Sequence, residues 1–187
     1  MLNGCDISKW QKDVPDNMDF VICRAAYGKT IDSKFYSHMD KLKNKLVGAY
    51  LYAKTNEDPI ECADVFIDIV NKCEQFGRTM ILALDIEGTD AKRCNAVNWC
   101  STWIKRVIEK TGIKPVLYIQ SSMTNKFSEL SKLDCGLWLA HWTSYSKIKH
   151  RGWKNWCLWQ YSDSNGKLDL DKFNGTKEQY LKYCKGN

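Results

Sequence analysis

The sequence predicts an α/β fold, an irregular TIM-like barrel of roughly five β/α units followed by three strands with few helices. Short strand-like runs alternate with longer stretches of helical period, which implies a parallel sheet covered on both faces. A complete eightfold β/α barrel takes about 250 residues, whereas this chain has 187. The shortage is local, because after Leu137 the strand-like runs follow one another without full helices between them.

The expected strands are short runs rich in apolar, β-branched and aromatic residues. They span residues 20–27, 47–53, 80–86, 115–120, 137–142 and 156–161. Two further strand-like segments, each with acidic residues, lie near the chain ends at 5–8 and 168–171. We therefore expect the first and last parts of the chain to meet in a closed barrel.

Two segments have the period of an amphipathic helix. One apolar face consists of Ile60, Ala63, Phe66, Ile67, Val70 and Cys73, and the other of Ala96, Trp99, Cys100, Trp103, Ile104, Val107 and Ile108. Asp58-Pro59 is typical of a helix start, and Thr111-Gly112 is typical of a helix end.

One domain over residues 1–187 is expected, because the sequence holds no internal repeat, low-complexity run or linker. No window approaches the ~18 unbroken apolar residues of a membrane span. The first residues also lack the basic and apolar regions of a signal peptide. The sequence therefore predicts a soluble domain without an export signal of its own.

The net charge of +6 fits a solvated lysine-rich surface, or general attraction to an anionic polymer. Nucleic-acid binding would need clustered basic residues and a recognisable motif, and neither is present. The nine cysteines form no CxxC pair, which disfavours a zinc ribbon or a thioredoxin-like motif. Cys5, Cys23, Cys135 and Cys157 lie in strand-like segments, so we favour reduced, buried thiols over a disulfide framework.

The segment with most chemical content is 83–88, where a buried strand leads into Asp85, Ile86 and Glu87. On a strand, residues i and i+2 face the same side about 6.5 to 7 Å apart. Asp85 and Glu87 should therefore both point into the barrel mouth, with Ile86 packed outward. Neighbouring carboxylates raise each other's pKa, so that one can stay protonated as a general acid. Glycosidic cleavage needs such an acid and a second group that stabilises positive charge on the sugar.

By itself an Asp-x-Glu sequence also fits solvated strand-end charges or ligands of a hard metal. Catalysis gains support from Asp6 and Asp169, which lie on strand-like segments at the two chain ends and could converge with Asp85 only in a closed barrel. Aromatic residues are numerous and alternate along the late strands, with Gln160 and His141 between them. This set is Trp138, Trp142, Trp159 and Tyr161. Each one singly fits core packing, but as a set near carboxylates they favour a carbohydrate cleft.

Other chemistries fit poorly. The sequence contains no GxSxG, HExxH, GxxxxGK or GxGxxG motif. The histidines, His38, His141 and His150, are too dispersed to suggest a metal site, and His38 is expected on a solvated helix. Neither a metal nor a cofactor is expected.

Together these segments resemble glycoside hydrolase family 25, the muramidases of bacteria, phages and some fungi. The resemblance covers nearly the whole chain and rests on modest motifs that recur in order. They are Gly4-Cys5-Asp6-Ile7-Ser8-Lys9-Trp10-Gln11, Asp32 with Phe35, Val47-Gly48-Ala49-Tyr50-Leu51-Tyr52, Leu84-Asp85-Ile86-Glu87, Thr111-Gly112 with Pro115 and Tyr118, Leu137-Trp138-Leu139-Ala140, Trp159-Gln160-Tyr161-Ser162, and Leu168-Asp169-Leu170-Asp171-Lys172-Phe173.

The resemblance implies hydrolysis of the β-1,4 bond between N-acetylmuramic acid and N-acetylglucosamine in bacterial peptidoglycan. It implies that Glu87 is the proton donor. Asp85 would either orient a reacting N-acetyl group or contact the oxocarbenium-like centre directly. Asp6 and Asp169 would complete the acidic cluster.

The resemblance also implies substrate contacts. Tyr50 and Tyr118 would line the negative subsite, and Trp138 and Gln160 would help to hold the glycan. Trp10 and Tyr52 are further candidates for substrate binding. The expected partner is the peptidoglycan glycan strand, bound by a monomer, with no nucleic acid or membrane involved.

Two other functions remain open at this point. One is a non-catalytic glycan-binding module, which need not keep both Asp85 and Glu87; the other is hydrolysis of another N-acetylated glycan such as chitin. For a muramidase we expect either storage in a host cytoplasm until release to the cell wall, as for an endolysin, or secretion after removal of a signal.

The sequence departs from the family pattern at several places. The family often has Lys-Ala-Thr/Ser-Glu-Gly after its second strand, whereas this chain has Arg24-Ala25-Ala26-Tyr27-Gly28. A charged residue at the rim is thus replaced by the aromatic Tyr27. Asp171 replaces a more common asparagine, and the segment before Asp169 is shorter than usual.

Overall fold

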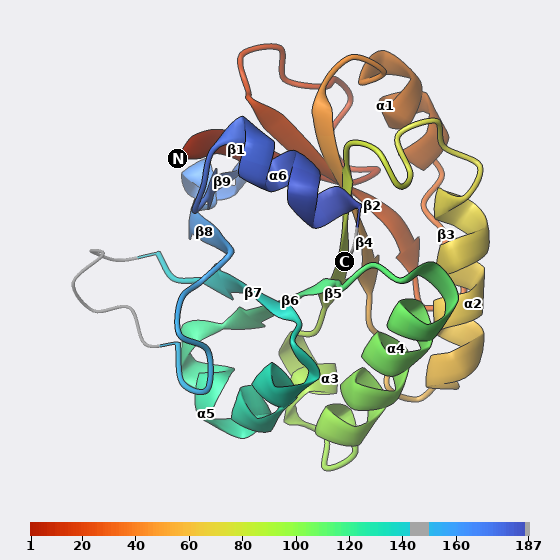
Figure 1. Cartoon of the computed structure of the whole chain (residues 1–187), viewed down its shortest axis with the longest axis vertical. Coiled ribbons are helices and arrows are strands. Elements are labelled where there is room, and N and C mark those ends of the chain that lie inside the picture. The colour runs from red at the N-terminus through yellow and green to blue at the C-terminus, as the bar shows by residue number, and fades with distance from the viewer. Residues whose placement is uncertain (143–149, 186–187) are drawn as a thin grey trace.

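The computed structural model describes residues 1–142 and 150–185, and its strands form one closed barrel (Figure 1). In sheet order the barrel strands are β1 (Leu2–Ile7), β9 (Asp169–Phe173), β8 (Leu158–Ser162), β7 (Gly136–Ala140), β6 (Val116–Gln120), β5 (Met80–Asp85), β4 (Leu46–Tyr52) and β2 (Phe20–Tyr27). Pairing of β1 with β2 closes the ring, and β3 (Thr30–Ile31) extends β2 outside it. This confirms the predicted irregular barrel.

The last strand differs from the rest in direction. β9 runs antiparallel to both of its neighbours, β1 and β8, whereas the other neighbouring strands of the barrel are parallel. An antiparallel strand can be joined to its predecessor by a short connection, while a parallel one needs a crossover. The barrel therefore closes within few residues, which explains how so short a chain completes it.

The helices cover the outside of the parallel part of the barrel. They are α1 (Phe35–Lys41), α2 (Pro59–Val70), α3 (Gly88–Lys92), α4 (Ala96–Thr111) and α5 (Thr124–Phe127), with short 3₁₀ turns η1 (Ser121–Met123), η2 (Ser128–Leu133) and η4 (Ser164–Gly166). The two long helices, α2 and α4, begin and end close to where the sequence predicts. Asp58 caps α2 with Pro59 in its first turn, and Gly112 ends α4 in the left-handed conformation at φ 69°.

Some boundaries differ from the expected ones. α2 ends at Val70, because residues 71–79 turn back toward β5 instead of continuing the face to Cys73. The first expected β/α unit lacks its helix. Residues 8–19, which connect β1 to β2, are all described and contain none. β7 ends at Ala140, so Trp142 lies beyond it.

His38 corrects another expectation. It lies on a helix, α1, but it is only 2% exposed and is not solvated. Phe35 and Met39 are buried on the same helix, so His38 belongs to the face that packs against the barrel. Burial lowers the pKa of its imidazole.

Side chains on the strands alternate between the barrel interior and the layer under the helices, as the period of a strand requires, except at the irregularity between Arg24 and Ala26 of β2. On β2, for example, Phe20 and Ile22 point inward while Val21 and Cys23 join the outer layer. Gly4 gives the room that this interior needs, since a Cβ there would lie 2.5 Å from the Phe20 ring.

One end of the barrel is closed by α6 (Lys177–Cys184), which lies across the opening in Figure 1. Tyr180 fills the interior, contacts the rings of Phe20 and Phe173, and donates a hydrogen bond of 2.8 Å to the carbonyl oxygen of Val47. Because this end is filled with apolar groups, a ligand can enter only from the other end, where the parallel strands have their carboxyl termini.

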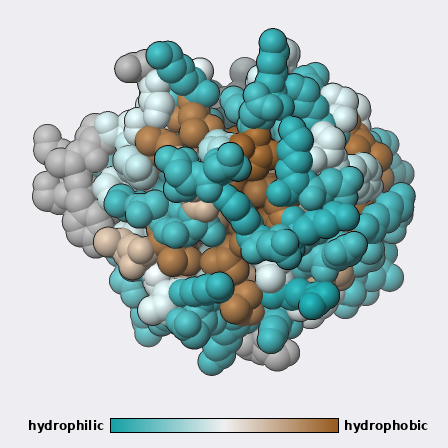
Figure 2. All heavy atoms as spheres, turned by 90° about the horizontal axis from the view of Figure 1, so that it is seen from above, coloured by the Kyte–Doolittle hydropathy of each residue, from teal (hydrophilic) through white to brown (hydrophobic). Residues whose placement is uncertain are grey.

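The outer surface is largely hydrophilic on the face shown in Figure 2, with hydrophobic atoms visible between the polar side chains. Within the described residues, no helix combines the length and apolarity needed to cross a bilayer. The structure pairs none of the nine cysteines; Cys5, Cys23 and Cys135 are buried, and Cys157 is half-buried.

Candidate active site

The open end of the barrel contains a pocket of about 290 Å³, which we call the acidic pocket. Its lining comes from the carboxyl ends of the parallel strands and from β9. The lining residues are Asp6, Ser8, Arg24, Tyr50, Tyr52, Asp85, Glu87, Tyr118, Trp138, Trp142, Gln160 and Asp169. All four predicted catalytic residues are therefore brought together, from segments as far apart as the two chain ends.

Asp85 and Glu87 lie as the strand geometry predicts. Asp85 is the last residue of β5 and is paired between Tyr52 of β4 and Tyr118 of β6. Ile86 is 1% exposed and packs in the outer apolar layer, which leaves both carboxyl groups on the pocket side. Gly88 follows with φ +58°, a left-handed conformation that strains other residues. It turns the chain directly after Glu87 into α3.

The electrostatics of this pair favour protonation. Burial is the main cause that raises the pKa of Asp85 well above its ordinary value; Glu87 and Asp6 add to the increase, and Arg24 opposes it. Burial also raises the pKa of Glu87, while a hydrogen bond from the Tyr52 hydroxyl partly offsets the increase. A carboxyl group that keeps its proton near neutral pH is what general-acid catalysis needs.

Asp6 and Asp169 face the pair from the closing seam of the barrel, where they are directly opposite in the β1–β9 register. Burial, and then the charge of Asp169, raise the pKa of Asp6 to about 7. Asp6 also accepts a 2.8 Å hydrogen bond from Nε2 of Gln160, which partly stabilises its charged form. Burial and Asp163 raise the pKa of Asp169. Burial and mutual repulsion therefore disfavour ionisation of all four carboxyl groups at once.

A hydrogen-bonded layer supports the pocket floor. Gln160 connects three parts of it: Nε2 donates to Asp6, and Oε1 accepts from Tyr118 Oη at 3.0 Å and from Trp142 Nε1 at 3.2 Å. Below it, Asp171 is completely buried and accepts a 2.7 Å hydrogen bond from Trp138 Nε1. These bonds fix the side chains that surround the carboxyl groups.

Most of the predicted substrate-binding residues line the acidic pocket, but they differ in what they can contact. Tyr50, Tyr118 and Trp138 pack edge to face, with ring centroids 6.0 Å apart for Tyr50–Trp138 and 5.0 Å for Tyr118–Trp138. Trp138 is only 1% exposed and forms the floor, whereas Tyr52 is half-buried at the rim. The aromatic wall is therefore rigid.

Trp10 is the exception among the predicted residues. It lies outside the acidic pocket, is 74% exposed, and lines an adjacent recess. Two of the four late aromatic residues expected in the cleft also lie outside the acidic pocket. Trp159 and Tyr161 alternate with Gln160, so they face the outer layer, where Trp159 donates a 2.8 Å hydrogen bond to the carbonyl oxygen of His141.

Arg24 and Ser8 line the pocket but are absent from the predicted set. Arg24 is an informative omission, because a basic residue within the buried apolar run of β2 is itself a signal of function. Its Nε lies 2.8 Å from Asp32, which is 5% exposed. No cluster of metal-ligating side chains is found among the described residues.

A carboxyl group with a raised pKa beside other carboxyl groups, in an aromatic-walled pocket at the strand ends of a barrel, is typical of glycoside hydrolases. The sequence matches the family described as Glycosyl hydrolases family 25 over residues 4–169. The protein belongs to this family and is a glycoside hydrolase.

Solved structures with the same fold include muramidases and endolysins. The muramidase from Acremonium alcalophilum superposes with a TM-score of 0.84 at 23% identity, over 100% of both chains. The catalytic domain of endolysin ply40 from bacteriophage P40 of Listeria monocytogenes gives 0.77 at 28% identity, over 100% of this chain and 98% of that one. Among sequences, the uncharacterized protein YegX of Escherichia coli K12 is 25% identical over 99% of this chain and 74% of its own.

Proposed function

We propose that the protein is a muramidase that hydrolyses the β-1,4 bond between N-acetylmuramic acid and N-acetylglucosamine in bacterial peptidoglycan, with Glu87 as the general acid. The observation that carries this proposal is the position of Glu87. It follows the buried Asp85 on the pocket side of the chain, and its pKa is raised. Membership of family 25 and the likeness to a phage endolysin domain support peptidoglycan as the substrate.

In this reaction Glu87 gives its proton to the glycosidic oxygen as the bond to the leaving sugar breaks. Positive charge then develops on the sugar at the cleavage site. Asp85, Asp6 and Asp169 surround that position, and the new positive charge favours their ionised forms. Asp85 acts on the substrate's acetamido group or on the oxocarbenium-like carbon itself, and both routes use the same pocket. A water molecule then forms the new bond to that carbon and gives a proton to Glu87, which restores the acid and completes the hydrolysis.

The test is digestion of purified peptidoglycan, with the products reduced by borohydride and identified by mass spectrometry. We expect fragments that end in reduced muramic acid from the wild type and none from Glu87→Gln. The matched control is Glu129→Gln, which makes the same change at an exposed glutamate outside the pocket and should leave the products unchanged.

Other products would contradict the proposal in distinct ways. Reduced glucosamine ends would mean that the other glycosidic bond is cut. Absence of new ends, together with retention of the protein on the same walls, would indicate a glycan-binding module. Cleavage of chitin but not of peptidoglycan would assign a different N-acetylated glycan.

The organisation of the working protein is part of the proposal. We propose that residues 1–187 form a single catalytic domain that acts as a monomer and reaches the wall either by release from a host cytoplasm or by secretion. A monomer should elute near its mass of 21.7 kDa in size-exclusion chromatography with light scattering. A stable dimer or two separate unfolding transitions would contradict this organisation.

A further inference from the structure

A second recess lies beside the acidic pocket and differs from it in charge. It has a volume of about 570 Å³ and is lined by Lys9, Trp10, Arg24, Tyr27, Thr30, Ile31, Asp32, Ser33 and Lys54. We call it the basic recess. Three of its lining residues are basic and one is acidic, whereas the acidic pocket has four acidic residues and only Arg24 as a basic one.

The two cavities adjoin. Arg24 lines both of them. The ring of Tyr52 in the acidic pocket and the ring of Tyr27 in the basic recess lie 5.0 Å apart. An extended glycan bound in the acidic pocket can therefore continue over these two rings into the recess, because flat aromatic faces suit the apolar faces of sugars.

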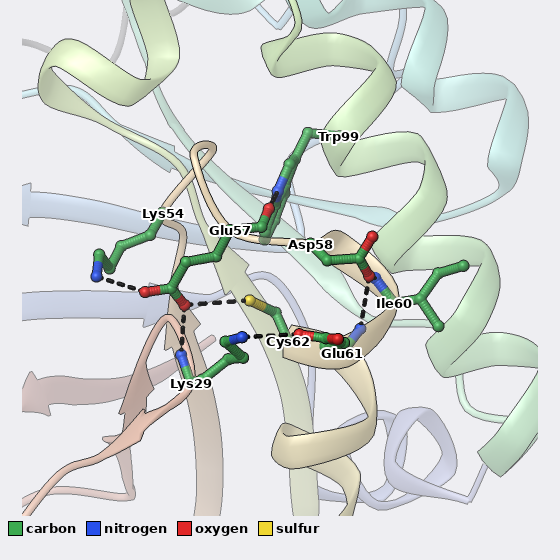
Figure 3. A network of polar contacts seen from close by, with 8 residues as sticks. All are labelled: Lys29, Lys54, Glu57, Asp58, Ile60, Glu61, Cys62 and Trp99. Atoms are coloured by element: carbon green, nitrogen blue, oxygen red, sulfur yellow. Dashed lines mark hydrogen bonds and ion pairs between the residues drawn. The ribbon is translucent and has the colours of Figure 1, made fainter.

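Within the recess, ion pairs already compensate two of the cations. Arg24 is paired with Asp32, and Lys54 with Glu57, which also accepts a hydrogen bond from the backbone of Lys29 and contacts Cys62 (Figure 3). Lys9 has no carboxylate partner among the described residues. Its ammonium group lies 5.0 Å from the ring centroid of the exposed Trp10. Lys9 is thus the cation of the recess that remains available to a ligand.

The backbone that carries Lys9 is held in place. The buried Asp32 accepts hydrogen bonds from the backbone N–H of Lys9 at 3.1 Å, from Arg24 Nε at 2.8 Å and from the backbone N–H of Lys34 at 3.0 Å. One carboxylate therefore joins the β1 loop to β2 and fixes the two sides of the recess relative to each other. A preorganised site loses less free energy in ordering when a ligand binds.

We propose that the basic recess binds the carboxylate-bearing side chain of a muramic acid residue next to the cleavage site, with Lys9 as the main anion contact. This inference rests on the proposed function and names the part of the substrate that the second site recognises. Where no peptide is attached, the carboxylate is that of the lactyl group; where a peptide is attached, the lactyl carboxyl is an amide and the carboxylate belongs to the peptide. The charges of the two cavities give the physical reason: the acidic pocket repels such a group, and the neighbouring recess attracts it.

Tyr27 contributes to this difference. A carboxylate at this position would place a further negative charge beside Lys54, whose ammonium lies 5.3 Å from the Tyr27 ring centroid. With tyrosine, the recess combines an aromatic surface with a net positive charge.

The test compares KM and kcat of wild type, Lys9→Gln and Lys9→Glu on soluble peptidoglycan fragments. The same fragments with their carboxylates converted to amides serve as the second substrate. We expect KM on the native fragments to rise about threefold for Lys9→Gln and about tenfold for Lys9→Glu, with kcat unchanged, because one partly exposed charge contact is lost or reversed. On the amidated fragments the KM and kcat of both variants should equal those of wild type.

Lys105→Gln and Lys105→Glu are the matched controls, since Lys105 is exposed on α4 and lines neither cavity. They change the net charge equally and should leave KM unchanged on both substrates. Fragments stripped of peptide by an amidase distinguish the two carboxylate sources. The amidase exposes the lactyl carboxylate, so a Lys9 effect on these fragments assigns that carboxylate as a ligand of the recess, and an effect confined to peptide-bearing fragments assigns the carboxylates of the peptide.

Two results would overturn the inference: equal KM for Lys9→Glu and wild type on native fragments, or the same increase on native and amidated fragments. Failure of the proposed function is a separate result, in which wild type releases no reducing ends from peptidoglycan. In that case calorimetry still tests the recess by comparing the affinities of the protein for native and amidated fragments. Tighter binding of the native fragments by wild type, with no such difference in Lys9→Glu, would support the inference. Equal affinities of wild type for both fragments would reject it.

Discussion

Asp171 shows how much the site depends on the protonation of one buried carboxyl group. One of its oxygens accepts the hydrogen bond from Trp138, and the other, Oδ2, has no partner as an acceptor. Burial and the charge of Asp6 raise its pKa well above the ordinary value. In its neutral form Asp171 can donate to Asp6, which stabilises the charged form of Asp6.

Asparagine should therefore replace Asp171 with little effect, because its amide can accept from Trp138 and donate to Asp6 at the same time. We expect kcat/KM of Asp171→Asn within about threefold of wild type, in contrast to a loss of about a hundredfold or more for Asp85→Asn. Asp171→Ala should lower the free energy of unfolding by about 1–3 kcal/mol, because the buried Trp138 N–H loses its acceptor. Steady-state kinetics and urea unfolding measure these effects; a severe Asp171→Asn with a mild Asp85→Asn would contradict the assignment of roles.

The pH dependence of turnover should follow Glu87. Activity requires protonated Glu87, so kcat falls as the pH rises through its raised pKa. The Tyr52 hydroxyl lowers that pKa by donating to the charged form. Tyr52→Phe should therefore move the alkaline limb of the kcat profile to higher pH. A profile that is unchanged, or moved to lower pH, would show that Glu87 does not control this limb.

The sequence predicted the acidic residues that line the pocket better than the residues that support it. Asp85 and Glu87 could be placed because the period of a strand determines which residues share a face. Lys9 and Asp32 join the β1 loop to β2 through side-chain contacts across 23 residues, and local patterns carry no information on such contacts. Trp10 could be recognised as a surface aromatic, but not as part of a second cavity.

At the level of elements, α2 illustrates how a loop after a barrel strand is anchored. Asp58 Oδ1 accepts hydrogen bonds of 2.9 Å from the backbone N–H groups of Ile60 and Glu61, and Trp99 on α4 donates a 2.7 Å hydrogen bond to the carbonyl oxygen of Glu57 (Figure 3). Glu57 in turn holds Lys54 at the basic recess. The start of α2 thereby connects the helical layer to the substrate face.

Asp58→Ala should destabilise the protein without affecting the chemistry. Two N–H groups at the start of α2 would lose their acceptor, which costs about 1 kcal/mol and should lower the melting temperature by roughly 2–4 °C. Differential scanning calorimetry measures the change, and kcat at 25 °C should equal that of wild type. Asp58→Ser, which keeps a capping oxygen, should recover most of the loss; equal destabilisation by both variants would reject capping as the cause.

Elements were predicted well where the periodic segment is long. Boundaries and burial were predicted poorly where they depend on contacts between distant parts of the chain. The two long helices carry complete apolar faces with their start and stop residues, so their positions follow from the sequence. The end of α2 at Val70 and the burial of His38 depend on how neighbouring elements cover α1 and α2, and no local pattern records this.

For the whole molecule, convergence of buried carboxyl groups in and below the acidic pocket makes stability depend on pH. Folding raises the pKa of Asp6 from 3.8 to about 7, and it raises the pKa of Asp85, Asp169 and Asp171 as well. The folded state therefore holds protons that the unfolded chain releases. This contribution to stability is complete below the unfolded pKa near 4 and is lost as the pH rises through the folded pKa.

We expect the free energy of unfolding to fall between pH 4 and pH 8, with roughly 2–4 kcal/mol of the decrease from Asp6. Asp6→Asn should reduce this decrease and be more stable than wild type at pH 8, although its activity is lost. Urea unfolding at a series of pH values measures both. An equal decrease in wild type and variant would show that the cluster does not cause it.

Closure of the barrel by β9 has a consequence for the order of events during synthesis. Asp6 on β1 is synthesised before the other strands of the barrel, whereas its opposite residue, Asp169 on β9, is synthesised after β2 to β8. A nascent chain that has exposed β1 through β8 still has an open seam and an incomplete set of acids. The acidic pocket is thus complete only after β9 has been synthesised and has paired with β1.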